Sequence, residues 1–153
     1  ADNGQFLELF DQLPPEVLRV VAETDATDFQ PVLSKYVEAI DATVSGNSFS
    51  YAETVVRKMG PLVTADRALP ELKAQALEAI LLSCVRLNRF AAIESFNTLL
   101  KGIKEDRDAM EVAEMLRRRE REYKQICSGV PSLKLHPTIR QVRDEFCPPD
   151  NGE

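Results

Sequence analysis

The residue types that most often carry out enzyme chemistry are scarce in this sequence and spread along the chain. His136 is the single histidine, and because it directly precedes Pro137 we expect it in a loop or at a helix cap. The sequence has no glycine-rich phosphate loop, no Gly-x-Ser-x-Gly motif and no His-Glu-x-x-His motif. Acid–base and nucleophilic catalysis need reactive groups within mutual reach. We therefore expect a protein that is not an enzyme.

The cysteines and carboxylates show no metal-binding pattern. Cys84, Cys127 and Cys147 lack the spacing of a zinc site or a redox couple, and three thiols cannot all pair within one chain. We expect reduced thiols, with Cys84 in the core and Cys147, beside two prolines, accessible to solvent. The acidic residues match neither a calcium loop nor a di-iron site. No metal and no cofactor are therefore expected.

A group of basic residues near the C-terminal end stands out from the rest of the chain. Positions 117–124 hold five basic and two acidic residues, a local net charge of +3. This segment belongs to a helix expected from about residue 108 to residue 127, the longest and most polar of the chain. The residues on the inward side of that helix recur at alternating spacings of three and four, and Arg119 is the one charged residue among them. The other members of this inward line are Ala109, Val112, Leu116, Tyr123 and Ile126.

The basic segment has two interpretations. It is a solvated helix face if Glu114 with Arg118, and Glu120 with Lys124, form the favourable i, i+4 ion pairs of exposed helices. It is a docking surface if its guanidinium groups bind carboxylates or phosphates of a partner in a bidentate manner. The candidate partner-binding residues are Arg117, Arg118, Arg119, Arg121, Tyr123 and Lys124.

The leading functional hypothesis is a protein-interaction or adaptor module that docks another protein through this basic helix and through grooves between helices. Residues 1–50 carry nine acidic and two basic side chains, so the contrast with the basic segment would also permit head-to-tail self-association.

Two alternatives use other chemistry. A nucleic-acid-binding domain could use the same helix together with Lys134, Arg140 and Arg143, and its affinity would fall steeply with salt. The net charge of −6 counts against this hypothesis. A helix-lined pocket for an apolar ligand is the third hypothesis, and abundant leucine, isoleucine and phenylalanine are its only support.

Apolar residues recur at helical spacing between breaks rich in proline, glycine and acidic residues, and no long stretch alternates as a strand would. The sequence therefore predicts an all-α single domain of about seven or eight helices, either an antiparallel bundle or a short, α-solenoid-like array of stacked helix pairs. Residues 74–105 resemble one tetratricopeptide unit, through Leu77, Ile80 and Leu81, a corner at residues 88–90, and then Ala92, Ile93, Phe96 and Leu99. A similar break and helix about 40 residues upstream is nearer the period of HEAT-like helix pairs. The helix of residues 70–87 is the most apolar and should form the hub of the core.

The domain should cover residues 1–147, followed by a disordered tail at 148–153. No stretch approaches the ~18–20 consecutive apolar residues of a membrane span. We expect a soluble, intracellular protein, located in the cytoplasm or in an organelle after removal of a targeting segment.

Overall fold

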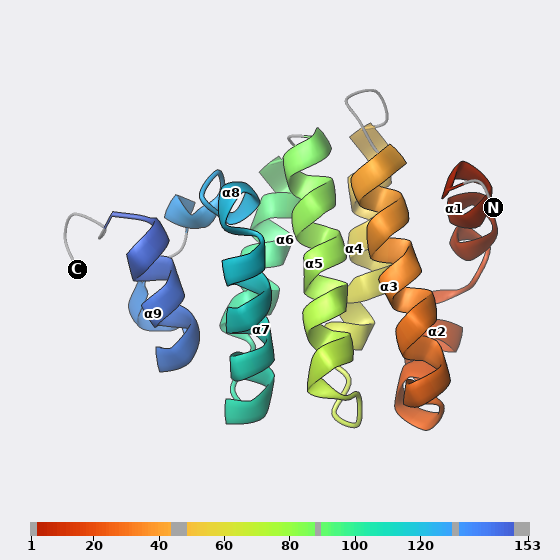
Figure 1. The fold of residues 1–153 in the computed structure, drawn as a ribbon, viewed down its shortest axis with the longest axis horizontal. Coiled ribbons are helices and arrows are strands. Elements are labelled where there is room, and N and C mark those ends of the chain that lie inside the picture. Colours follow the sequence, from red (N-terminus) through yellow and green to blue (C-terminus); the bar gives the residue numbers. More distant parts are fainter. Residues whose placement is uncertain (1–2, 44–48, 88–89, 130–131, 149–153) are drawn as a thin grey trace.

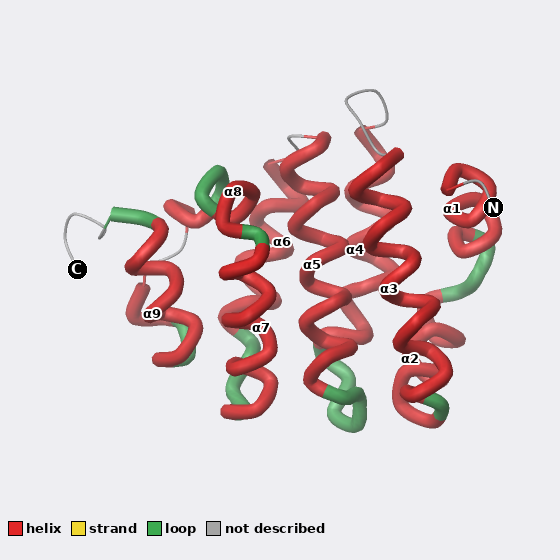
Figure 2. The backbone as a smooth tube through the Cα atoms, viewed as in Figure 1, coloured by secondary structure: helices red, strands yellow, loops and turns green. Residues whose placement is uncertain are grey.

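The computed structural model describes residues 3–43, 49–87, 90–129 and 132–148. These residues form nine α-helices and two short 3₁₀ helices, joined by loops without any strand (Figure 2). The all-α prediction is therefore confirmed. The helices are α1 (Asn3–Asp11), α2 (Pro15–Thr24), α3 (Ala26–Thr43), α4 (Phe49–Val63), α5 (Pro70–Leu87), α6 (Phe90–Lys101), α7 (Asp106–Arg118), α8 (Glu120–Tyr123) and α9 (Pro137–Phe146).

The helices are arranged in two layers. Helices α1, α3, α5, α7 and α9 form one layer, in which each packs on the next, and α2, α4 and α6 form the second layer behind them (Figure 1). Short connections make successive helices antiparallel, and each helix can bury its apolar side only against its neighbours. Of the two arrangements expected, the stacked helix-pair array is the one observed.

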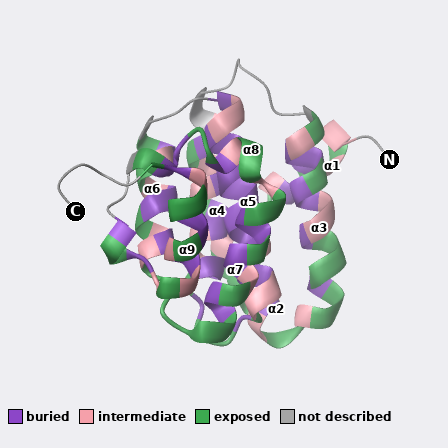
Figure 3. Cartoon of the chain, turned by 60° about the vertical axis from the view of Figure 1, so that its left-hand side comes forward, coloured by how far each residue is buried: buried purple, intermediate pink, exposed green. Residues whose placement is uncertain are grey.

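Helix α5 is the centre of the core, as its composition predicts. It packs against α3, α4, α6 and α7, and buried residues follow it on all sides (Figure 3). A helix with partners all around needs apolar residues all around, which is why α5 lacks the amphipathic pattern of a surface helix.

Proline sets the beginning of several helices. Pro15, Pro70 and Pro137 each occupy the first position of a helix, where a missing N–H costs no hydrogen bond. The cap predicted at His136 is confirmed, because its Nδ1 accepts a hydrogen bond from the Thr138 N–H at 3.1 Å. The stop or kink expected near Pro61 does not end α4, which continues to Val63.

The single helix expected over residues 108–127 is divided. α7 ends at Arg118, Arg119 has φ −107° and ψ 36°, and α8 is one turn long before a 3₁₀ helix begins at Cys127. The prediction that this helix is the longest is therefore wrong, since α3 and α5 have 18 residues each. The inward line is confirmed in its apolar members, which are all buried.

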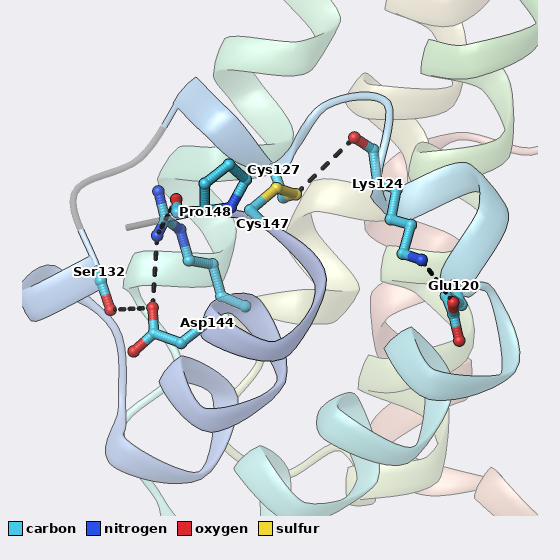
Figure 4. Close-up of a disulfide and its surroundings, with 8 residues drawn as sticks. Glu120, Lys124, Cys127, Ser132, Asp144, Cys147 and Pro148 are labelled. Carbon is cyan, nitrogen blue, oxygen red and sulfur yellow. Dashed lines mark hydrogen bonds and ion pairs between the residues drawn. A yellow bond between two sulfur atoms is a disulfide. The ribbon is translucent and has the colours of Figure 1, made fainter. Parts of the chain in front are cut away.

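The expectation of three reduced cysteines is also wrong. Cys127 and Cys147 form a disulfide with a Cα–Cα distance of 6.2 Å (Figure 4). Cys84 is free and buried. Cys147 is itself buried, because α9 packs on α7 and brings its C-terminal end against the chain that follows α8. Disulfides persist mainly in oxidising compartments. The argument from reduced thiols to an intracellular protein therefore no longer applies.

The described helices include none that is both long and apolar enough to cross a membrane. Of the predicted tail, Pro148 is exposed, and residues 149–153 lie outside the described residues.

Candidate docking surface at the corner of α7 and α8

The break between α7 and α8 lies at the residue that interrupts the inward apolar line. The Arg119 N–H still bonds the Met115 carbonyl, but the backbone then leaves the helical conformation. The Arg119 Nε donates to Glu78 Oε2 at 2.7 Å, and its Nη1 donates to Asp41 Oδ2 at 3.3 Å. One guanidinium group thereby joins the corner to α5 and to α3.

Further ion pairs extend this contact into a network. Arg86 of α5 bonds Asp41, and its guanidinium also lies 3.8 Å from Glu122 of α8. Partial burial opposes the charge of Arg119, but the Glu78 and Asp41 carboxylates outweigh it and raise the Arg119 pKa above its ordinary value. The charges in the network therefore stabilise one another, and they hold the junction of α7 and α8 against α5 and α3.

The Tyr123 ring anchors α8 from the inside. Its side chain is 1% exposed and lies between Phe96 and Phe146, with ring centroids 6.4 and 6.5 Å away. Burial raises the pKa of its hydroxyl well above the usual range. Tyr123 and Arg119, both candidate partner-binding residues, thus serve the packing of the corner and do not form its outer face.

The other four candidates do lie on the outer face. Arg117, Arg118, Arg121 and Lys124 are all exposed, and we call them the basic corner. Arg117 pairs with Glu145 at 2.7 Å, Lys124 pairs with Glu120 at 2.7 Å, and Arg118 lies 3.7 Å from Glu78. Arg121 forms no ion pair with any residue that the structure describes. Exposed pairs of this kind contribute little to stability, because water and salt screen them.

The acidic partners of the corner were not apparent from the sequence. Glu78 and Asp41 lie 41 and 78 residues from Arg119, and Glu145 lies 28 residues from Arg117. Glu78 does leave one signal, since it is one of the few charged residues in the most apolar helix. Such a residue needs a partner, but the sequence does not say which one.

The structure also has open hollows away from the corner. One of about 580 Å³ lies at the loops before α5 and α7, and charged side chains such as Asp66, Lys104 and Arg107 line it. Another of about 590 Å³ lies between α4 and α6, where Val56 and Leu99 are among its lining residues. Within the described ranges, no three histidine, cysteine or acidic side chains are placed to hold a metal ion.

Compared with protein-family models, curated proteins and solved structures, the chain matches none. Its function must therefore be argued from its own surfaces.

The two roles of arginine at the corner can be separated by stability measurements. Arg119→Ala should lower the free energy of unfolding by about 1–2 kcal/mol, because the buried Glu78 loses its charged hydrogen-bond donor. Arg121→Ala, on the exposed face, should change it by less than about 0.5 kcal/mol. Urea unfolding followed by circular dichroism measures both variants. Equal losses would show that Arg119 has no special structural role.

Proposed function

We propose that this chain is a non-enzymatic protein-interaction module that binds an acidic segment of a partner protein through the basic corner. The observation that carries the proposal is the exposure of four cationic side chains on a backbone that the Arg119 network and the buried Tyr123 hold in place. A preorganised surface loses less conformational entropy on binding than a flexible one does.

The ion pairs of the basic corner do not prevent this use. Arg117 and Lys124 pair with exposed carboxylates, so a partner's carboxylates can replace Glu145 and Glu120 at little cost. Three of the four residues are arginines, whose planar guanidinium groups bind carboxylates with two parallel hydrogen bonds. An acidic peptide segment therefore fits this surface in charge and in geometry.

The nucleic-acid alternative loses part of its support in the structure. Arg143, one of the basic residues it would use, is fully buried, and it donates hydrogen bonds to Asp144 and to the Pro148 carbonyl. A protein partner is therefore the better proposal.

The test is charge reversal at the corner. The triple variant Arg117→Glu/Arg118→Glu/Arg121→Glu should reduce capture of a nuclease-resistant protein partner from lysate at least tenfold, because attraction becomes repulsion. Quantitative mass spectrometry compares the captured proteins for the wild-type and variant chains, with and without nuclease.

A matched control makes the same change in net charge elsewhere. Arg57, Arg67 and Lys104 are exposed and lie outside the corner, so their triple replacement by glutamate should leave capture unchanged. Circular dichroism should show the same helix content in all three proteins. Equal loss in the control, or capture of nuclease-sensitive material alone, would contradict the proposal.

A further inference from the structure

The two ends of the helix array differ in chemistry. Helices α1 and α2 and the turn between them expose Leu9 at 65%, Leu13 at 39%, Val17 at 44% and Val20 at 47%. These four residues, which we call the N-terminal apolar face, are half of the eight exposed large hydrophobic residues in the described part of the chain. Large apolar side chains that gather on one surface usually mark a binding site.

The packing of α1 and α2 explains why these residues share a face. Phe10 of α1 is buried against Tyr36 of α3, and Leu18 and Ala22 of α2 are buried where α2 packs on α3 and α4. The opposite sides of α1 and α2 therefore point away from the array, at its end (Figure 1). In stacked helical proteins the outer side of an end helix is normally polar.

The other end of the array follows that rule. Helix α9 presents Gln141, Asp144 and Glu145 to solvent, while its buried residues face α7. Of the two end surfaces that the structure describes, the N-terminal apolar face thus exposes more large apolar side chains.

The N-terminal apolar face rests on a well-anchored part of the structure. The Tyr51 hydroxyl donates to Asp11 at 3.2 Å, and the Lys58 ammonium donates to the Leu13 carbonyl at 2.6 Å. The Phe10 and Tyr36 rings stack with centroids 4.1 Å apart. These contacts hold the end of α1 and the turn into α2 against α3 and α4.

The charges around this face indicate the sign of its partner. Glu8, Glu16, Asp25 and Asp28 are exposed on or beside α1 and α2. Arg19, which lies among them, is already paired with Glu23 at 2.9 Å. An apolar surface with an acidic rim complements a helix that carries leucine-like residues on one side and lysine or arginine along its flanks.

A second copy of this chain does not fit the face in a symmetric pair. Two N-terminal apolar faces placed together would bring the acidic residues of both copies into contact, and like charges across an interface are unfavourable.

We infer that the N-terminal apolar face binds a basic amphipathic helix of another protein, which adds to the array as one more packed helix. This surface is separate from the basic corner, so the two surfaces take partners of opposite charge. The inference does not rest on the function proposed above.

A designed peptide tests the inference directly. The probe is a fluorescein-labelled 21-residue helix with leucine at i, i+3, i+4 and i+7 spacing and lysine elsewhere, titrated by fluorescence anisotropy. The double variant Leu9→Asp/Val20→Asp should weaken binding at least tenfold, although it makes the protein more acidic. The matched control Met110→Asp/Leu133→Asp adds the same charge at side chains that are 58% and 70% exposed outside this face, and it should bind as the wild type does. A peptide with glutamate in place of lysine should bind at least tenfold more weakly.

Other outcomes would overturn the inference. Equal or tighter binding of the lysine peptide by Leu9→Asp/Val20→Asp would show that attraction is electrostatic only. A dimer in light scattering that this variant abolishes would make a second copy the occupant. The Arg117→Glu/Arg118→Glu/Arg121→Glu variant should bind the peptide normally, so failure here is distinguishable from failure at the basic corner.

Discussion

Replacing Asp108 by alanine should lower the free energy of unfolding by about 3 kcal/mol, because it leaves the Lys73 charge without a partner in a buried site. The Lys73 ammonium lies 2.9 Å from Asp108 Oδ2, and each side chain is only 10% exposed. Asp108 also lies in the first turn of α7, where a negative charge interacts favourably with the helix dipole. The measurement is urea unfolding of the wild type and the variant at pH 7.

A double variant separates the loss of the ion pair from the cost of an unpaired charge. Lys73→Met/Asp108→Leu replaces both charges by apolar side chains and should be close to the wild type in stability. A double-mutant cycle then gives the coupling between the two residues. A loss below about 0.5 kcal/mol in Asp108→Ala would contradict the prediction. It would mean that the Lys73 ammonium regains water from the adjoining hollow, which it helps to line.

Replacing Cys147 by serine should also lower the free energy of unfolding by about 3 kcal/mol, because the disulfide closes a loop over a sequence separation of 20 residues. The cross-link removes conformations from the unfolded chain, and it keeps α9 against α7 in the folded one. A reductant should destabilise the wild type by a similar amount and leave Cys147→Ser unchanged. Thermal or urea unfolding with and without reductant makes this comparison.

Thiol counting checks the same assignment independently. Burial raises the pKa of Cys84 to about 12, so its thiol should not react with a thiol reagent in the native protein. Unfolding without a reductant should expose one reactive thiol, and unfolding after reduction should expose three. Three reactive thiols in the unreduced, unfolded protein would show that the disulfide is absent.

The helices of this protein could largely be predicted, because helical periodicity and proline positions are local properties of the sequence. The start of α5 at Pro70, the cap at His136 and the inward line of α7 all follow from residues within a few positions of each other. The break at Arg119 could not be predicted in the same way. It accompanies bonds to Glu78 and Asp41, which only the packing of α3, α5 and α7 brings together.

The sequence predicted part of the candidate surface correctly, since four of the six candidate residues lie on the exposed face. Periodicity placed Tyr123 on the inward line, so its burial was foreseeable, but the chemical types of Arg119 and Tyr123 favoured including both in a docking surface. The disulfide gave no signal, because no spacing rule relates Cys127 to Cys147 when the segment between them has irregular structure. The N-terminal apolar face gave none either. A residue such as Val20 has the same appearance in a sequence whether its neighbour is the core or water.

The layered arrangement has a consequence for how the chain folds. The main helix contacts join successive helices or helices separated by one other helix along the chain. The contact order is therefore low, and little loop-closure entropy opposes the formation of these contacts. Folding can therefore nucleate around α4 and α5 and spread outward in both directions. The outermost helices have neighbours on one side only, and they form the units that open first. The disulfide restrains α9, whereas α1 and α2 have no such link, so a helix bound on the N-terminal apolar face would supply the neighbour that they lack.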